Sequence, residues 1–185
     1  MSKSIYTPRL KLRQWQMSDL KPFAQMNAAP EVMHYFPTVL TESDSNALAN
    51  KIQKLIDQKG YGFWAVELLA TQEFIGFVGL NEIDGDSELA KTLNMDNNFL
   101  EIGWRLAKKY WGKGYASEAA KAALDFAFND LLTQRVYAFT AEVNQPSQRV
   151  MQRLGMVHTE QVFNHPNVEQ GHALERHCLY YIDRF

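Results

Sequence analysis

The pattern of apolar and polar positions predicts that the chain opens with a strand followed by two helices. Residues 9–15 alternate apolar and basic side chains, which is the period of a half-buried strand. Residues 19–27 carry apolar side chains at helical spacing after Ser18, which we expect to cap that helix. A second helix is expected over residues 42–58, with Thr41 as its N-cap and a glycine at its end.

The rest of the chain has mainly the pattern of strands, interrupted by two helices. Residues 63–69 and 74–83 are rich in β-branched and aromatic side chains and predict a hairpin. Residues 84–98 are polar and acidic, and we expect a surface loop there. The remaining elements are a strand, a helix, a strand, a short helix and two strands, over residues 99–107, 116–129, 135–143, 146–154, 156–163 and 177–183. This order, with no repeat or linker, predicts a single mixed αβ domain over residues 1–185.

Composition narrows the class of protein. The chain has 185 residues, of which 46% are hydrophobic and 22% charged, as in a soluble globular domain. No apolar stretch approaches the roughly 20 residues of a membrane span, so we expect a cytoplasmic protein without a membrane partner. A net charge of −2 argues against a broad basic surface that would hold nucleic acid. Cys178 is the only cysteine and is expected to be a buried thiol in a strand.

The most informative segment is residues 101–120, where a strand leads through a glycine-containing loop into a helix. Gly112 and Gly114 lie in that loop, and the helix follows at once. Backbone N–H groups and the positive end of a helix dipole together favour a phosphate or pyrophosphate, and glycines allow close approach. The loop lacks the Gly-Lys-Ser/Thr ending of a nucleotide-hydrolysing P-loop and the third glycine of the dinucleotide motif. An ordinary turn before a helix is the alternative.

A second motif strengthens the phosphate interpretation. Residues 144–156 have the sequence Asn-Gln-Pro-Ser-Gln-Arg-Val-Met-Gln-Arg-Leu-Gly-Met, and residues 109–117 have Lys-Tyr-Trp-Gly-Lys-Gly-Tyr-Ala-Ser. The pair resembles two signatures of the GNAT superfamily of N-acetyltransferases, Gln/Arg-x-x-Gly-x-Gly/Ala and Asn-x-x-Ser-x-Arg followed by Gly-Phe, in the form of the RimJ/RimL branch. Lys109 departs from the first signature and Met156 from the second. Residues 165–180 resemble the final hairpin of the same branch.

The resemblance implies the GNAT fold, an α+β domain with a central, mostly antiparallel seven-stranded sheet flanked by about four helices. The sheet is expected to splay between its fourth and fifth strands to admit acetyl-CoA, and no metal is expected. The residues that the resemblance places against acetyl-CoA are Trp104, Arg105, Leu106, Lys109, Trp111, Gly112, Lys113, Gly114, Tyr115, Ala116, Ser117 and Asn144. For Trp104 the alternative is a place in the core, and for the two lysines a solvated surface.

Acetyl transfer requires a deprotonated amine, a polarised thioester carbonyl and a proton for the departing thiolate. The resemblance implies that a backbone N–H near residues 104–106 polarises the carbonyl and that Glu101 is the base. Alternative bases are Glu82 and three histidines of predicted loops, His34, His165 and His172.

The proton donor departs from the usual pattern of the superfamily. Many GNAT enzymes carry a tyrosine seven residues after the motif asparagine, where this chain has Met151. Ser147 resembles a serine proposed for this role in the RimJ/RimL branch, and a water molecule could serve instead. The alternative role of Ser147 is to cap the helix that begins near Pro146.

The resemblance implies a primary amine as acceptor, in the first place a protein N-terminal α-amine such as that of a ribosomal protein, by direct transfer. A small-molecule amine such as a polyamine, amino sugar or antibiotic is an alternative. Because Met151 replaces the usual acid, a non-catalytic acyl-CoA-binding sensor is another. Exposed edge strands are compatible with a homodimer.

Overall fold

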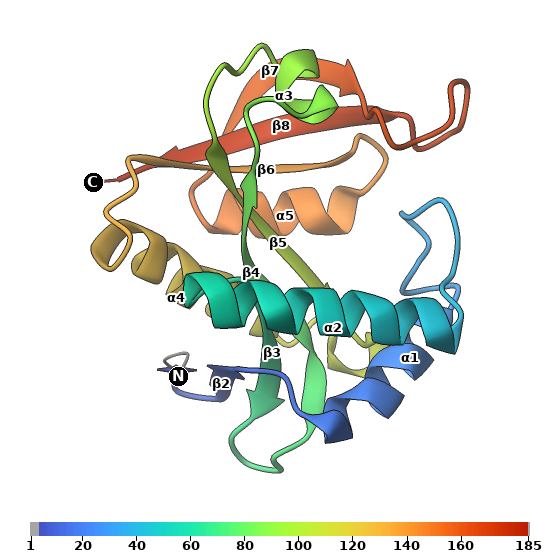
Figure 1. The fold of residues 1–185 in the computed structure, drawn as a ribbon, viewed down its shortest axis with the longest axis vertical. Helices are drawn as coiled ribbons and strands as arrows, with labels where there is room; N and C mark the ends of the chain where they lie inside the picture. Colours follow the sequence, from blue (N-terminus) through green and yellow to red (C-terminus); the bar gives the residue numbers. More distant parts are fainter. Residues whose placement is uncertain (1–3, 185) are drawn as a thin grey trace. The chain divides into compact units, whose positions relative to one another are not determined.

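The computed structural model describes residues 4–184. Its strands are β1 (Ile5–Tyr6), β2 (Leu10–Arg13), β3 (Phe63–Leu68), β4 (Phe74–Ile83), β5 (Phe99–Leu106), β6 (Arg135–Ala141), β7 (Val157–Asn164) and β8 (Arg176–Asp183). Its α-helices are α1 (Leu20–Ala28), α2 (Glu42–Lys59), α3 (Glu88–Thr92), α4 (Tyr115–Asn129) and α5 (Gln145–Arg153), as Figure 1 shows. Two 3-10 helices, η1 (Met17–Asp19) and η2 (Lys108–Tyr110), precede α1 and α4.

The strands of the described residues form one sheet in the order β1-β2-β3-β4-β5-β6-β8-β7. Its registered pairs are antiparallel except that of β5 with β6, which is parallel at Leu100–Val136 and Glu101–Tyr137. The expected α+β class and mostly antiparallel sheet are thus confirmed. The two-residue strand β1 was not anticipated, and it brings the number of strands to eight. The splay of the sheet stays a prediction.

Residues 4–184 pack as two compact units. The first holds the described residues up to Leu80 together with Gly103–Ala123, and the second holds Asn81–Ile102 and the described residues from Leu124 onward. In sequence, the glycine loop belongs to the first unit and the asparagine motif to the second.

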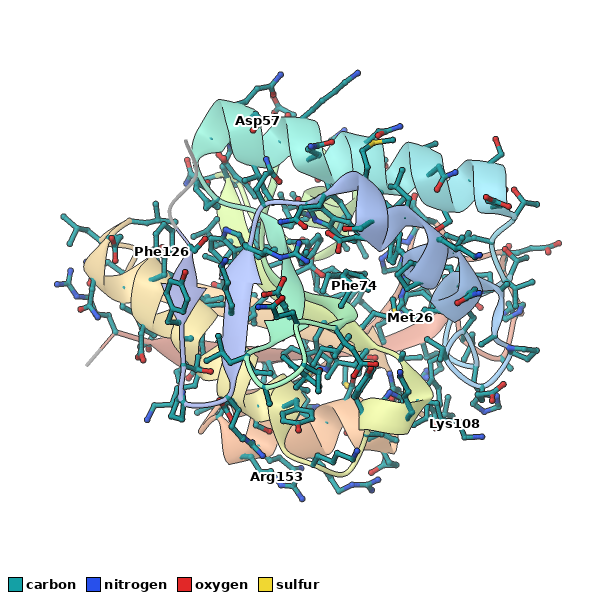
Figure 2. The ribbon with its side chains drawn as sticks, turned by 90° about the horizontal axis from the view of Figure 1, so that it is seen from below. Met26, Asp57, Phe74, Lys108, Phe126 and Arg153 are labelled. Carbon is teal, nitrogen blue, oxygen red and sulfur yellow. The ribbon has the colours of Figure 1, made fainter. Side chains whose placement is uncertain are left out.

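An aromatic cluster forms much of the interior of the first unit. The rings of Trp15 and Phe23 meet edge to face at 4.8 Å between centroids, and Phe74 lies 6.2 Å from Phe23. Edge-to-face rings at these distances are favourable because the positive ring edge meets the negative face. α1 and α2 lie side by side (Figure 1), and Figure 2 shows Asp57 on α2 and Phe74 on β4. Burial of this cluster holds α1 to β4.

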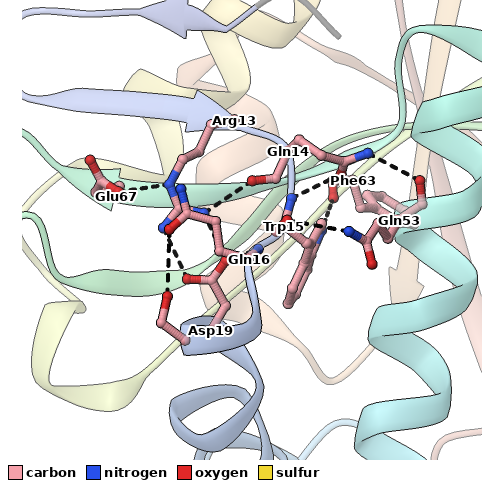
Figure 3. A network of polar contacts seen from close by, with 9 residues as sticks. Arg13, Gln14, Trp15, Gln16, Asp19, Gln53, Phe63 and Glu67 are labelled. Atoms are coloured by element: carbon pink, nitrogen blue, oxygen red, sulfur yellow. Dashed lines mark hydrogen bonds and ion pairs between the residues drawn. The ribbon is translucent and has the colours of Figure 1, made fainter. Parts of the chain in front are cut away.

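A buried ion-pair network joins the start of α1 to the strands beside it (Figure 3). Arg13 on β2 donates from Nη1 and Nη2 to the two carboxylate oxygens of Asp19 at 2.7 and 2.9 Å, and from Nε to Glu67 on β3 at 2.7 Å. The side chains of Arg13 and Asp19 are only 5% and 2% exposed. The expected cap, Ser18, is wrong: it lies inside η1, and Asp19 accepts from the Gln16 N–H.

Helix α2 begins and ends as its sequence predicts. Thr41 Oγ1 accepts from the backbone N–H of Asp44 at 3.1 Å, and Gly60 has a φ of 79° directly after Lys59. A positive φ is costly for residues with a Cβ, which is why a glycine ends the helix.

The second unit contains β6, β8 and β7 as neighbouring strands, with α5 packed against β6 (Figure 1). Its core includes Leu93, Phe163 and Leu179. The expectation of a plain loop over residues 84–98 is wrong, because α3 forms there with Ser87 Oγ accepting from the Ala90 N–H at 3.2 Å. Apolar side chains from this segment therefore belong to the core. Cys178 is buried, as expected.

We expect Asp19→Ala to lower the free energy of unfolding by about 3 kcal/mol or more, because it leaves the buried Arg13 guanidinium short of a carboxylate. Chemical denaturation followed by circular dichroism measures this. The matched control is Asp183→Ala, which breaks the exposed pair with Arg135, whose side chains are 43% and 51% exposed. A surface pair contributes little, so the control should change stability far less. Equal losses in the two variants would contradict the importance of the buried network.

Candidate active site

The glycine loop of the first unit has the backbone shape of an anion-binding turn. Gly112 and Gly114 have φ angles of 71° and 79°, and α4 begins at the next residue, Tyr115. A Cβ on Gly112 would meet nothing within 4 Å, so the backbone conformation and not lack of space favours glycine there. The Glu118 N–H donates to Gly114 O at 3.0 Å and closes the first turn. The N–H groups of that turn have no partner within the helix, so this loop fits a phosphate group.

Side chains around the loop hold its shape. Trp111 donates from its indole N–H to Leu106 O at 2.7 Å, although the residue is 46% exposed. Lys109 is exposed and lies 3.4 Å from Glu73, and Lys113 is exposed. Tyr115, Ala116 and Ser117 are half-buried in the first turn of α4. The predicted loop residues thus come together in one segment, with both lysines at its surface.

A contact that the sequence did not reveal fastens this loop to the start of the chain. Glu118 accepts from Thr7 Oγ1 at 2.6 Å, from the Arg9 N–H at 3.0 Å and from Arg9 Nε at 2.6 Å. Arg9 also donates from Nη1 to Lys113 O at 2.9 Å, and its guanidinium stacks over Tyr115. Glu118 lies in the first turn of α4, where a negative charge also favours the helix dipole. Partners more than 100 residues apart leave no local signal.

The end of β5 supplies the other predicted residues of the first unit. Leu106 is buried and Trp104 is half-buried. Arg105 donates from Nη1 to Asn27 Oδ1 at 2.7 Å, and its guanidinium carbon lies 4.0 Å from the centre of the Phe36 ring. These two partners come from the end of α1 and from the segment after it, so the strand end is fixed to the α1–α2 connection.

Glu101, in the second unit, has a carboxyl group whose surroundings shift its pKa. It lies on β5 opposite Tyr137 of β6, and Asn81 donates to its Oε2 at 3.3 Å. Burial raises the pKa of Glu101 to about 7, and the hydrogen bond from Asn81 opposes that rise. The rival Glu82 accepts instead from Asn98 at 2.9 Å. A carboxyl group that titrates near neutral pH suits a general base.

The asparagine motif forms the start of α5. Asn144 is buried, accepts from the Ser147 N–H at 3.2 Å and donates to Thr140 Oγ1 at 2.8 Å. Asn144 therefore caps α5. The alternative prediction that Ser147 caps this helix is wrong. Met151, at the position of the usual tyrosine, is buried.

The three candidate histidines differ in environment. Burial, with a smaller effect of the nearby His177, lowers the pKa of His165 to about 4, and the two ring centroids are 4.7 Å apart. His172 Nδ1 accepts from the Leu174 N–H at 3.0 Å within its own loop. His34 lies edge to face against Tyr35. A base with a pKa near 4 would be too weak for an amine, which argues against His165.

Residues 9–157 match a family model described as an acetyltransferase (GNAT) domain. The chain belongs to the GNAT acetyltransferase family. YnaD of Bacillus subtilis, named an uncharacterized N-acetyltransferase, is 32% identical over 155 residues, which cover 82% of this chain and 81% of the relative. The predicted superfamily and the predicted N-acetyltransferase activity are thereby confirmed.

Two solved structures share the fold of this GNAT chain. The GNAT-family acetyltransferase of Bacillus anthracis has a TM-score of 0.77 and 27% identity, with 98% of each chain covered. RimL, described as a ribosomal L7/L12 alpha-N-protein acetyltransferase in complex with coenzyme A, has a TM-score of 0.74, 17% identity and 98% coverage of each chain. Structures of the suspected RimJ/RimL branch are therefore among those that share this fold.

The GNAT family uses acetyl-CoA, and the geometry of the glycine loop agrees with that cosubstrate. Among residues 4–184, no three or more side chains of His, Cys, Asp or Glu are grouped as metal ligands. None of the helices in the described part of the chain has the length and hydropathy that a membrane span requires.

We expect Glu118→Gln to weaken acetyl-CoA binding by about three- to tenfold, because the charge-assisted bonds that join Arg9 to this helix turn are lost. Calorimetric titration of acetyl-CoA measures the change. Glu88→Gln is the matched control, since Glu88 also lies in the first turn of a helix but forms an exposed ion pair with Lys91, three residues away. Unchanged affinity in Glu118→Gln would show that the contact with Arg9 does not shape the loop.

Proposed function

We propose that this GNAT enzyme transfers the acetyl group of acetyl-CoA directly to an α-amine, most simply that of a protein N-terminus. The observation that carries the proposal is Glu101, a carboxyl group whose pKa burial raises to about 7. An α-amine has a pKa of about 8, whereas an alkyl amine of the lysine type has a pKa of about 10.4. A base that titrates near 7 is well matched to the first and poorly matched to the second. The shared fold of RimL, whose description names a protein α-amine, supports the same acceptor.

Several of the predicted residues have a role in this proposal. The N–H groups of the loop from Gly112 to Ser117 bind the pyrophosphate of acetyl-CoA, and Lys109 and Lys113 add a favourable field. A backbone N–H among residues 104–106 polarises the thioester carbonyl. The Asn144 amide binds the pantetheine arm.

The proposed reaction transfers one proton to the base and one to the leaving group. Glu101 accepts a proton from the protonated amine, and the amine nitrogen attacks the thioester carbonyl carbon. The C–S bond then breaks, and the thiolate takes a proton from Ser147 or from water. The attacking nitrogen gives its second proton back to that donor, so the neutral amide forms and the donor is restored. Glu101 loses its proton to solvent, so the enzyme returns to its starting state with coenzyme A and the acetylated amine as products.

Thiol release from acetyl-CoA, measured with N-terminal peptides and with polyamines, tests the acceptor class. We expect amine-dependent release with kcat/KM for peptides at least tenfold above that for polyamines at pH 7.5, because of the match in pKa. Calorimetric titration of acetyl-CoA is run beside it. Binding without release on any amine would support the sensor alternative, and preference for polyamines or amino sugars would support a small-molecule acceptor.

Glu101 predicts a distinct pH dependence. Only the ionised carboxylate accepts a proton, so kcat/KM should rise as pH increases through about 7, from roughly one tenth of its limit at pH 6. Glu101→Gln should lower the rate about 100-fold and remove this limb of the profile. A profile from pH 5.5 to 8.5 with a peptide acceptor measures both. A limb that persists in Glu101→Gln would belong to another group.

The two asparagines give a matched pair for the same assay. Asn81→Ala removes the hydrogen bond that favours ionised Glu101, so its pKa and the limb should move to higher pH. Asn98→Ala removes the corresponding bond to Glu82 and should leave the limb in place. The opposite result would identify Glu82 as the base.

A further inference from the structure

Arg105 is a half-buried cation that has no carboxylate partner among the described residues. None of the ion pairs in the described part of the chain includes Arg105. Its Nε atom is buried and has no hydrogen-bond partner among residues 4–184. Burial lowers the pKa of Arg105 to about 10, so the guanidinium still carries its charge at neutral pH. Burial of an uncompensated charge is unfavourable, and an anion from outside the chain would relieve it.

Arg13, in the same unit, provides an internal comparison. Its Nε and both Nη atoms meet Asp19 and Glu67, so its donors are filled by the protein. Within the described part of the chain, the Arg105 side chain makes one hydrogen bond, from Nη1 to Asn27. The two arginines therefore differ in their partners. The protein supplies acceptors for the donors of Arg13, whereas Nε and Nη2 of Arg105 have no acceptor among the described residues.

The surroundings of Arg105 hold it in one orientation. Asn27 is fully buried and donates from Nδ2 to the buried hydroxyl of Ser45 at 2.9 Å, which turns its carbonyl oxygen toward Arg105. The guanidinium is stacked on Phe36 at 4.0 Å and lies 5.4 Å from the centre of Phe77. With Nη1 engaged, Nε and Nη2 remain as the side-on pair of donors. This pair matches the two oxygens of a carboxylate.

The position of the Nε and Nη2 donors of Arg105 indicates that their ligand belongs to the acceptor. Phe36 is 39% exposed, so the stack reaches solvent beside the α1–α2 connection. Figure 2 shows Met26, the neighbour of Asn27, and Lys108, which follows β5, on the same side of the first unit. Arg105 lies on the strand end to which we assigned the thioester carbonyl, so an amine that attacks there comes close to its side chain. This step rests on the proposed function.

We propose that Arg105, held by Asn27 and stacked on Phe36, binds a carboxylate that lies next to the acceptor amine. Two sources share this chemistry. One is the side chain of an acidic N-terminal residue in a peptide, and the other is the α-carboxylate of a free amino acid. Arg105 thereby favours acceptors that carry a carboxylate next to the amine.

Matched acceptors test the proposal with the wild-type enzyme. Peptides that begin with Asp or Glu are compared with the same peptides that begin with Asn or Gln, and free amino acids with their amides. We expect KM to be about tenfold lower for the acidic member of the pair that corresponds to the true source, as one charge-assisted bidentate contact would give. Equal KM values within both kinds of pair would overturn the proposal, and this result needs no variant.

Arg105→Met should reduce the acidic preference from about tenfold to near one, and Arg105→Lys, which keeps the charge but loses the side-on donors, should give an intermediate value. Lys108→Met is the matched control, because it removes a nearby positive charge that pairs with Glu31. The control should keep the preference. A preference that survives in Arg105→Met, or that Lys108→Met abolishes equally, would overturn the assignment.

Binding measurements keep this test separate from that of the proposed function. Calorimetric titration of the Asp and Asn peptides in the presence of coenzyme A reports the carboxylate preference without turnover. If no amine is acetylated but the Asp peptide still binds about tenfold more tightly in the wild type alone, the carboxylate site stands and the transferase proposal fails. If Arg105→Met instead weakens acetyl-CoA binding and leaves the peptide ratio unchanged, the arginine serves the cosubstrate and the acceptor role is wrong.

Discussion

The position of α1 depends on the buried network around Arg13. A guanidinium at 5% exposure is tolerated only because Asp19 and Glu67 bring two carboxylates to it. Asp19 immediately precedes α1, so the start of that helix cannot move away from β2 and β3 without separating these charges. Asn27 lies near the other end of the same helix and orients Arg105. The Arg13 network and the asparagine that orients Arg105 therefore lie at opposite ends of one helix.

The two arginines show how the same side chain can serve stability or recognition. The donors of the Arg13 guanidinium are taken by the carboxylates of Asp19 and Glu67, so its charge is balanced without a ligand. Arg105 is held by an amide and by aromatic rings, which fix the direction of the guanidinium and add no negative charge. Amide and ring contacts orient a cation at a lower energetic gain than an ion pair does. Such an environment leaves most of the electrostatic attraction for a ligand.

Features encoded by neighbouring residues could be predicted from the sequence, and features that depend on distant partners could not. Thr41 caps α2, and Gly60 ends it, through contacts within four residues. Ser18 was expected to cap α1 because its side chain is suitable, but Ser18 lies within η1. Asp19 takes the N-cap position of α1, and its carboxylate accepts from the distant Arg13. The helix α3 was missed because polar residues around it outweighed Leu89 and Leu93, which reach the core only in the folded chain. Arg9 and Glu118 are 109 residues apart and leave no joint pattern.

The same distinction explains why the reaction is easier to infer than the acceptor. The proposed pyrophosphate loop is one contiguous segment whose backbone needs positive φ at Gly112 and Gly114, so its chemistry is visible as a glycine pattern. The base is harder to predict from the sequence, because the pKa of Glu101 depends on burial and on Asn81, twenty residues away. The proposed carboxylate site at Arg105 is the hardest to predict from the sequence, because Asn27 and Arg105 are 78 residues apart and meet only after folding. Chains that share the loop can therefore differ in acceptor, and the acceptor has to be inferred from side chains that only the fold brings together.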